Sequence, residues 1–162
     1  MGAGKSTIGL LLSKELNTPF YDIDKAIEER AGANIPWIFD IEGEAGFRQR
    51  EEQVIEELTR LSPVIVATGG GAVISAANRE SLSARGMVIY LKTTVEQQLE
   101  RTSKDKNRPL LQAESPRDVL TQLMKTREPL YQQISDLTIH TDRRHPRTVV
   151  SEIIKKIKTD FS

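Results

Sequence analysis

The sequence predicts an α/β fold in which helices cover both faces of a parallel β-sheet. Short apolar runs rich in Val and Ile alternate with amphipathic segments at helical spacing. A glycine-rich segment opens the first of these helices, as it does where a strand turns into a helix around a phosphate. Alternating strands and helices are typical of a parallel sheet between two helical layers. We therefore expect one three-layer domain over residues 1–162.

Four strands and three strongly patterned helices are expected along the chain. The strands cover residues 20–23, 64–68, 87–91 and 137–140. Apolar residues recur at helical spacing over 8–16, 54–61 and 149–157. The chain shows no internal repeat and no linker, which agrees with a single domain.

A fifth strand is expected ahead of the first residue. A phosphate-binding loop is the turn between a strand and a helix, yet no strand precedes Met1. In folds built around such a loop this strand lies inside the sheet, where it pairs with both neighbours. We expect the natural chain to extend upstream by about ten residues, roughly a strand and the two missing loop residues.

The composition describes one domain without net charge. The 162 residues are enough for a sizeable core, and 23 basic residues balance 23 acidic ones. This balance gives no electrostatic reason to expect nucleic acid or an anionic membrane surface as a partner. Cysteine is absent, which excludes disulfides, thiol catalysis and zinc sites with Cys ligands. No run is long enough to span a membrane and none resembles a signal peptide, so we expect a cytoplasmic protein.

The start of the chain carries most of a phosphate-binding loop. Gly4-Lys5-Ser6 completes the pattern Gly-x-x-x-x-Gly-Lys-[Ser/Thr], whose first glycine would lie two residues before Met1. In such a loop backbone N–H groups face a polyphosphate, the lysine reaches the terminal phosphates and the hydroxyl ligates Mg²⁺. The helix that follows adds the positive end of its dipole. The residues expected to bind nucleotide phosphates are Gly2, Ala3, Gly4, Lys5, Ser6 and Thr7.

Two aspartates close the strand predicted over 20–23. Strand periodicity would place Asp22 and Asp24 on one side, at the carboxyl end of the sheet where ligands bind. One carboxylate can hold hydrated Mg²⁺, and the other can accept a hydrogen bond from a substrate hydroxyl. Alternatively, Asp24 only N-caps a helix over Lys25–Ala31, which leaves Asp22 without an explanation.

Arg48 and a run of three glycines each have two interpretations. Arg48 precedes Glu51 and Glu52 at helical spacing, which is typical of a solvated ion pair. It could instead grip a substrate carboxylate while Glu51 steadies its guanidinium. Gly69-Gly70-Gly71 ends the strand over 64–68, where glycines form a tight turn or let a ligand approach the backbone closely.

Two further segments have less specific interpretations. The polar stretch over 102–109 is either a solvated loop or a lid that brings an arginine over the phosphates. Arg127 and Tyr131 lie on a helical run interrupted by Pro129, and residue patterns alone do not single them out.

The histidines and the tryptophan have structural explanations. His140 and His145 lack a convincing ligand set and are interpreted as structural or solvated. Trp37 is expected to pack against the helix that begins near Ile35, or to border the substrate site.

Six motifs together resemble the shikimate kinase family, a member of the nucleoside monophosphate kinase group. The resemblance covers essentially the whole chain, and the set is far more specific than the phosphate loop alone. In order, the motifs are Gly-Ala-Gly-Lys-Ser-Thr (2–7), Asp-Ile-Asp (22–24), Gly-Glu-Ala-Gly-Phe-Arg (43–48), Ala-Thr-Gly-Gly-Gly (67–71), Asn-Arg-Pro-Leu-Leu (107–111) and Arg-Glu-Pro-Leu-Tyr (127–131).

The resemblance implies a three-layer P-loop kinase fold with five parallel strands, the first of them absent from this chain. It implies ATP-dependent phosphorylation of the 3-hydroxyl of shikimate, on the route to chorismate and the aromatic amino acids. Mg²⁺ would be the cofactor, ATP and shikimate the small-molecule partners, and the enzyme a monomer without nucleic-acid or membrane partners. The substrate-binding region would cover about 24–61 and the lid about 102–114.

The resemblance also implies a role for individual residues. Lys5, Asp24 and Arg108 would be catalytic, with Arg108 reaching from the lid to the transferring phosphate. Ser6 would bind Mg²⁺ directly and Asp22 through water. Arg144 matches the loop on the adenine side, and the residues assigned to shikimate are Asp24, Arg48, Gly70 and Arg127.

Two other functions are compatible with the phosphate loop. A different small-molecule kinase, such as a gluconate kinase, shares the loop but does not need a carboxylate-binding pair beside Asp24. A nucleotide-binding module without catalysis is the second alternative, and the presence of Lys5, Asp24 and Arg108 argues against it.

Overall fold

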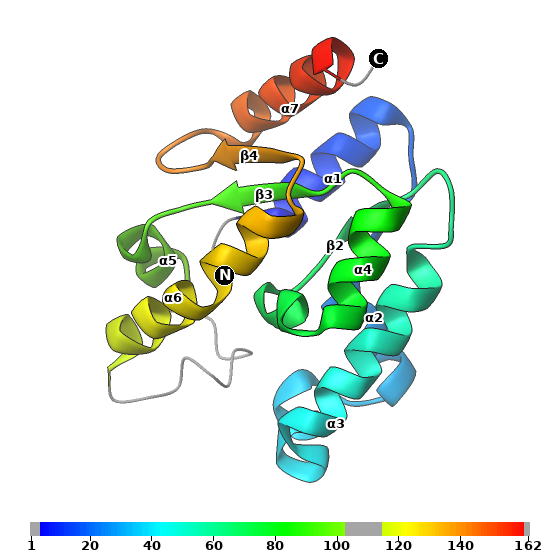
Figure 1. The fold of residues 1–162 in the computed structure, drawn as a ribbon, viewed down its shortest axis with the longest axis vertical. Coiled ribbons are helices and arrows are strands. Elements are labelled where there is room, and N and C mark those ends of the chain that lie inside the picture. Colours follow the sequence, from blue (N-terminus) through cyan, green and yellow to red (C-terminus); the bar gives the residue numbers. More distant parts are fainter. Residues whose placement is uncertain (1–3, 103–114, 161–162) are drawn as a thin grey trace.

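The computed structural model describes residues 4–102 and 115–160. The predicted lid and Arg108 therefore lie outside the described residues, apart from the lid's first position, and so do Gly2 and Ala3 of the phosphate loop. The elements follow in the order α1 (Lys5–Leu16), β1 (Phe20–Asp22), α2 (Ile23–Ala31), α3 (Ile35–Leu58), β2 (Ile65–Ala67), the 3-10 helix η1 (Gly70–Ile74), α4 (Ala76–Arg85), β3 (Ile89–Lys92), α5 (Val95–Thr102), α6 (Pro116–Ile134), β4 (Leu137–His140) and α7 (Pro146–Asp160) (Figure 1).

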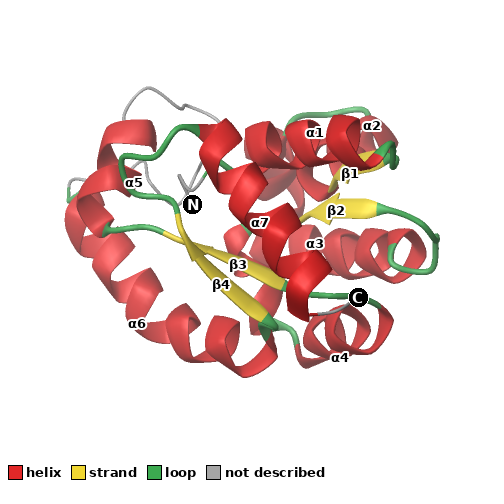
Figure 2. Cartoon of the chain, turned by 90° about the horizontal axis from the view of Figure 1, so that it is seen from above, coloured by secondary structure: helices red, strands yellow, loops and turns green. Residues whose placement is uncertain are grey.

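The strands form two parallel pairs within the described part of the chain. β1 pairs with β2, with Phe20 opposite Ile65, and β3 pairs with β4, with Ile89 opposite Leu137. Figure 2 shows the two pairs apart from each other, with α1 above them and α4 and α6 below. This arrangement confirms the predicted α/β class with parallel strands and helices on both faces.

An apolar cavity of about 430 Å³ lies between the two strand pairs. β2 and β3 line it from either side, and α1 covers it. Neither strand has a pairing partner across the cavity among the described residues. The strand expected ahead of the phosphate loop would lie here and pair with both; it stays a prediction. The apolar lining residues include Ile8, Leu12, Ile65, Val66, Ile89 and Leu91.

The apolar core divides into two clusters. One cluster joins α2, α3 and η1 around side chains such as Ile27 and Ile55, which are buried. The other joins α1, β4 and α7 around Ile139 and Ile153. β2 contributes to both clusters, because Val66 packs against the first and Ile65 against the second. In Figure 1, α2 and α3 form the lower end of the molecule and α7 the upper end.

Several element boundaries differ from the predicted ones, with α3 as the largest case. The side chain of Asn34 caps α3 by accepting a hydrogen bond from the N–H of Trp37 at 2.9 Å. The helix then bends at Gly43, whose φ of +74° favours glycine. Trp37 lies within α3 and is 59% exposed, so the expectation that it packs against this helix is wrong.

The helix over 116–134 runs through Pro129 without a break. A proline in a helix removes one backbone hydrogen bond, and here the surrounding packing retains the helical path. Arg127 and Tyr131 consequently lie on one helix, one turn apart. None of the described helices is long and apolar enough to cross a membrane.

Candidate functional site

The phosphate loop passes into α1 at Gly4. Gly4 has a φ of +80°, which a side chain would strain, and its carbonyl oxygen accepts the first helical hydrogen bond, from the N–H of Ile8. Helix α1 begins at Lys5, so its first N–H groups and the positive end of its dipole face the loop. The described end of the loop is thus a helix N-terminus, an arrangement that commonly binds anions.

Lys5 and Ser6 both converge on Asp22. The Ser6 hydroxyl donates a hydrogen bond of 2.7 Å to Asp22 Oδ2, and Lys5 Nζ lies 3.9 Å from the same oxygen. Burial alone would raise the pKa of Asp22. The charge of Lys5 and the hydrogen bonds from Ser6 and from the backbone outweigh burial and hold that pKa below its usual value. Asp22 is therefore a carboxylate beside the end of the phosphate loop.

The Ser6–Asp22 pair fits a magnesium ion that is shared with phosphates. Mg²⁺ prefers oxygen ligands and usually takes only one or two from the protein when a nucleotide supplies others. The residues given structure here include no group of three or more His, Cys, Asp or Glu side chains that could hold a metal without a ligand. A hydroxyl and an ionised carboxylate in contact are the donor set expected for this kind of site.

Asp24 does not continue the strand that the sequence predicted. Helix α2 begins at Ile23, so Asp24 lies in its first turn, and the prediction from strand periodicity is wrong. The alternative that Asp24 caps the helix is also wrong, because Asp22 is the cap and accepts from the N–H of Lys25 at 3.3 Å. Asp22 therefore turns to the phosphate loop. A Cβ on Gly69 would stand 3.2 Å from Asp24 Oδ1, so Asp24 lies at the glycine turn.

Arg48 pairs with a glutamate that is buried. Arg48 Nη1 lies 2.9 Å from Glu51 Oε1, and Glu51 is only 1% exposed, so the solvated ion pair is the wrong interpretation. Glu52 instead accepts a hydrogen bond from Ser75. The Arg48 guanidinium lies against Gly71, where a Cβ would come within 2.3 Å of Nη2. Only glycine at this position lets the guanidinium approach the turn so closely.

Burial governs the electrostatics of Glu51. Burial raises its pKa, Arg48 counteracts this effect, and the negative charge of Asp24 adds to the rise. Glu51 Oε2 has no hydrogen-bond partner within the described residues. It lies 3.7 Å from the point where a Cβ on Gly69 would stand, close to Asp24. Two carboxylates and the glycine turn thus border the same space.

Arg127 adds a second, more deeply buried guanidinium. It is 3% exposed, and its Nε has no hydrogen-bond partner in the part of the chain described. Burial lowers its pKa, Tyr131 opposes this change, and the positive charge of Arg48 reinforces it. The two arginines therefore repel each other across the site. A bound anion between them would relieve that repulsion.

Arg101 is a cation at the phosphate loop that our sequence analysis missed. Its Nη1 lies 3.7 Å from the position of a Cβ on Gly4, and its Nη2 donates to the carbonyl oxygen of Thr141 at 3.2 Å. Arg101 stands at the end of α5, just before the polar stretch that drew attention to Arg108. Its position on the exposed end of a short amphipathic helix gave no signal in the sequence.

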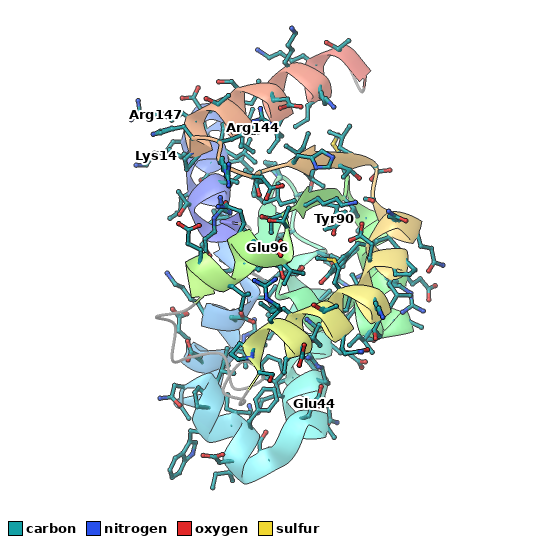
Figure 3. The ribbon with its side chains drawn as sticks, turned by 90° about the vertical axis from the view of Figure 1, so that its left-hand side faces the viewer. Lys14, Glu44, Tyr90, Glu96, Arg144 and Arg147 are labelled. Carbon is teal, nitrogen blue, oxygen red and sulfur yellow. The ribbon has the colours of Figure 1, made fainter. Side chains whose placement is uncertain are left out.

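Arg144 lies apart from the residues around the glycine turn. Its Nη1 donates to the carbonyl oxygen of His140 at 2.8 Å, and it pairs with Glu152 of α7. Figure 3 shows Arg144 at the start of α7, near one end of the molecule, and Glu44 of α3 near the other. The side chains of His140 and His145 are exposed, as expected for solvated histidines.

The structure thus brings the predicted residues together as two adjoining groups. One holds Gly4, Lys5, Ser6 and Asp22, and the other holds Asp24, Arg48, Glu51, Gly69, Gly70, Gly71 and Arg127. Thr7 is exposed on α1, behind the loop. The first group has the donors for phosphate and metal, and the second has two cations and two carboxylates around a glycine turn.

Comparisons with known proteins match this arrangement. The family model described as "Shikimate kinase" matches residues 1–158. The shikimate kinase of Vibrio cholerae is 55% identical over 158 residues, which are 98% of this chain and 91% of the relative. That of Haemophilus influenzae is 58% identical over 158 residues, 97% of this chain and 88% of the relative.

Solved structures agree with the sequence comparisons. Shikimate kinase from Acinetobacter baumannii in complex with shikimate superposes with a TM-score of 0.98 at 49% identity, covering 99% of this chain and 90% of that one. Shikimate kinase from Aquifex aeolicus gives a TM-score of 0.82 at 34% identity, covering 98% of this chain and 91% of that one.

Proposed function

The chain belongs to the shikimate kinase family, and from that membership we propose which of its residues carry each part of the reaction. The reaction transfers the γ-phosphoryl group of ATP to the 3-hydroxyl of shikimate and gives shikimate 3-phosphate. A phosphoryl group passes through a loose transition state, so positioning and charge stabilisation supply most of the catalysis. The residues around the glycine turn would position shikimate, and the phosphate loop would position ATP and stabilise the charge on the transferring group.

The two arginines beside the glycine turn are the main support for shikimate as the acceptor. Arg48 is paired with the buried Glu51, and Arg127 is buried with an Nε that has no hydrogen-bond partner among the described residues. Arginine binds carboxylates through two parallel hydrogen bonds, and buried arginines need such a partner. We assign the carboxylate of shikimate to this pair. Gly70 and its neighbours Gly69 and Gly71 would face the substrate with their backbone.

Asp24 is the proposed partner of the reacting hydroxyl. It stands beside Gly69, within the set of residues around the glycine turn that we call the acceptor group. A carboxylate at hydrogen-bond distance from an alcohol aligns it for in-line attack and accepts its proton late in the transfer. The negative charge of Asp24 contributes to the raised pKa of the neighbouring Glu51, so the two carboxyl groups lie close enough to interact.

The phosphate loop and the arginine at 108 form the proposed donor side. The loop from Gly2 to Thr7 would hold the ATP phosphates, with Lys5 on the transferring group and Arg144 beside the adenine. Ser6 would bind Mg²⁺ directly and Asp22 through water; when bound, the ion offsets charge on the phosphate oxygens. The resemblance supports Arg108 as the cation that reaches the transferring phosphate from a lid over 102–114.

The domain proposal follows from the same assignments. The substrate-binding region over 24–61 contains Asp24, Arg48 and Glu51, and it coincides with one of the two apolar clusters. We propose that the enzyme works as a monomer, because both groups of the site come from one chain.

ADP release tests the proposed function directly. Mg-ATP is offered with shikimate, with gluconate or without an acceptor, and turnover is expected with shikimate alone. Arg127→Ala should raise the KM for shikimate strongly and leave the KM for ATP nearly unchanged. The matched control is Arg117→Ala, since Arg117 lies on the same helix but is exposed and paired with Glu96. An Arg127→Ala variant that binds shikimate normally would exclude the assignment.

Arg108→Ala separates the donor side from the acceptor side. An arginine that stabilises the transferring phosphate contributes about 10³–10⁵ in rate. We expect kcat to fall on that order while the affinity for shikimate stays nearly intact. A near-normal kcat would reject the role of Arg108.

A further inference from the structure

A tyrosine joins the two elements that carry the acceptor group. Tyr131 lies in α6, and its hydroxyl donates a hydrogen bond of 2.6 Å to the carbonyl oxygen of Gly70, the first residue of η1. Burial raises the pKa of Tyr131 against the opposing charge of Arg127, so the hydroxyl keeps its proton at neutral pH. The bond is therefore a permanent brace between helix and turn.

The brace fixes the orientation of the peptide between Gly70 and Gly71. In a planar trans peptide the C=O and the following N–H point in opposite directions. With the Gly70 carbonyl directed at Tyr131, the N–H of Gly71 is directed away from α6. The Arg48 guanidinium lies against Gly71. Tyr131 thus determines the orientation of the surface on which Arg48 rests.

The same helix carries Arg127 one turn earlier. Residues four apart on a helix lie on the same face, so Arg127 and Tyr131 both face the turn. Arg127 is buried, and the positive charge of Arg48 acts against its own. A fixed contact between α6 and the turn is needed to hold two repelling guanidiniums at a constant spacing. Tyr131 is the residue whose hydrogen bond supplies this contact.

The ring of Tyr131 is held independently of its hydroxyl. It stacks on the ring of Tyr90 from β3, with centroids 4.7 Å apart and planes tilted by 33°. The Tyr90 hydroxyl donates to Glu128, which also pairs with Lys92 at 3.0 Å. A phenylalanine at position 131 would keep this stacking and lose the bond to Gly70 together with the contact between the hydroxyl and the Arg127 guanidinium.

We propose that Tyr131 is a positioning residue for the acceptor. Through the Gly70 carbonyl and its contact with the Arg127 guanidinium it sets the spacing between Arg127 and Arg48, and so the affinity for the substrate carboxylate, without touching the substrate. The inference rests on the function proposed above for the two arginines.

Tyr131→Phe, measured by steady-state kinetics, tests the proposal. The KM for shikimate should rise about five- to tenfold, the factor that corresponds to one hydrogen bond of ordinary strength. The values of kcat and of the KM for ATP should stay within about twofold, because the hydrogen bond from Tyr131 goes to the glycine turn. p-Aminophenylalanine at position 131 restores a donor at the same place, and it should recover most of the affinity that p-methylphenylalanine does not.

Tyr90→Phe is the matched control. It removes a hydroxyl that bonds Glu128 and keeps the ring that supports Tyr131. We expect it to lower the melting temperature and leave the KM for shikimate unchanged. Tyr131→Phe that lowers only the melting temperature, or that raises the KM for ATP as much as that for shikimate, overturns the proposal.

The Arg127→Ala variant separates the two possible failures. If Arg127→Ala leaves the KM for shikimate unchanged, the proposed function of the arginine pair fails. If Arg127→Ala raises that KM and Tyr131→Phe does not, the carboxylate site stands and only the positioning role fails. In the double variant the two effects should be less than additive, because both act on the same guanidinium.

Discussion

Helix α3 presents two glutamates, five positions apart, to opposite surroundings. Glu51 lies in the acceptor group, 1% exposed and paired with one arginine, and burial raises its pKa. Glu56 lies at the surface between α3 and α4, where hydrogen bonds from Arg85 and Arg60 lower its pKa to about 2. The same residue type on one helix is thus tuned in opposite directions, by burial at the site and by ion pairs at the surface.

The two regions also differ in whether their polar atoms have hydrogen-bond partners. Both oxygens of Glu56 accept hydrogen bonds, from Arg60, Arg85 and Ser81. In the acceptor group one oxygen of Glu51 and the Nε of Arg127 have no partner within the described residues. A buried polar group without a partner costs about 1–3 kcal/mol, so its presence suggests a site arranged for a ligand. The surface network contributes to stability alone.

Among these variants, Arg48→Ala should weaken shikimate binding the most. Arg48→Ala removes one carboxylate-binding guanidinium and leaves Glu51 buried without its countercharge. Loss of one partner from a buried charge pair costs about 2–5 kcal/mol, so we expect the KM for shikimate to rise by roughly 100-fold or more. Steady-state kinetics at fixed ATP measures this.

The surface network supplies the control for Arg48. Arg60 pairs with Glu56 and its side chain is 67% exposed. Arg60→Ala should leave the KM for shikimate unchanged. If Arg48→Ala altered only the KM for ATP, the division of the molecule into these two regions would be wrong.

A methyl group at Gly71 should have the next largest effect. The Cβ of Gly71→Ala would stand 2.3 Å from Arg48 Nη2, so the guanidinium has to move. Displacing a binding group by about 1 Å costs up to 10² in rate, and we expect roughly a tenfold rise in the KM for shikimate. Gly86→Ala is the control, because nothing lies within 4 Å of its Cβ. Equal kinetics of the two variants would show that the close approach of Arg48 is dispensable.

The motifs predicted the membership of the acceptor group but not its geometry. The Asp-Ile-Asp motif was predicted as strand, whereas the carboxylate of Asp22 begins a helix by capping it and sends Asp24 to a different partner. Strand periodicity cannot anticipate this, because one hydrogen bond to the cap decides where the strand ends. The predicted α/β class is nevertheless correct, because it depends on the order of the apolar runs and not on their exact ends.

Burial was the property that the sequence could not supply. Glu51 and Glu52 occupy equivalent places in the pattern after Arg48, yet one is buried beside Asp24 and the other bonds Ser75. The choice depends on which side of α3 faces the glycine turn, which is a tertiary contact. Arg101 and the bond from Tyr131 to Gly70 were missed for the same reason.

Glu51→Gln tests whether the charge of Glu51 steadies Arg48 for shikimate binding. The amide keeps the size of the side chain and removes the charge that steadies Arg48, so we expect the KM for shikimate to rise about five- to tenfold at neutral pH. Protonated wild-type Glu51 resembles the amide. Because its pKa is raised above the ordinary 4.5, the difference between wild type and variant should narrow as the pH falls, before pH 4.5 is reached. A difference independent of pH would show that the charge of Glu51 is not what steadies Arg48.

Glu56→Gln should have the smallest effect, and on stability alone. The pKa of Glu56 is lowered from 4.5 to about 2, so the unfolded chain binds the proton more readily than the folded one between these values. The stabilisation from Glu56 is therefore fully present above about pH 4.5 and is lost as the pH falls to about 2. Urea denaturation at several pH values should give a constant difference in the free energy of unfolding at higher pH and none near pH 2. Salt should reduce that difference because the network is exposed. A change in the KM for shikimate in this variant would show that the surface network extends into the acceptor site.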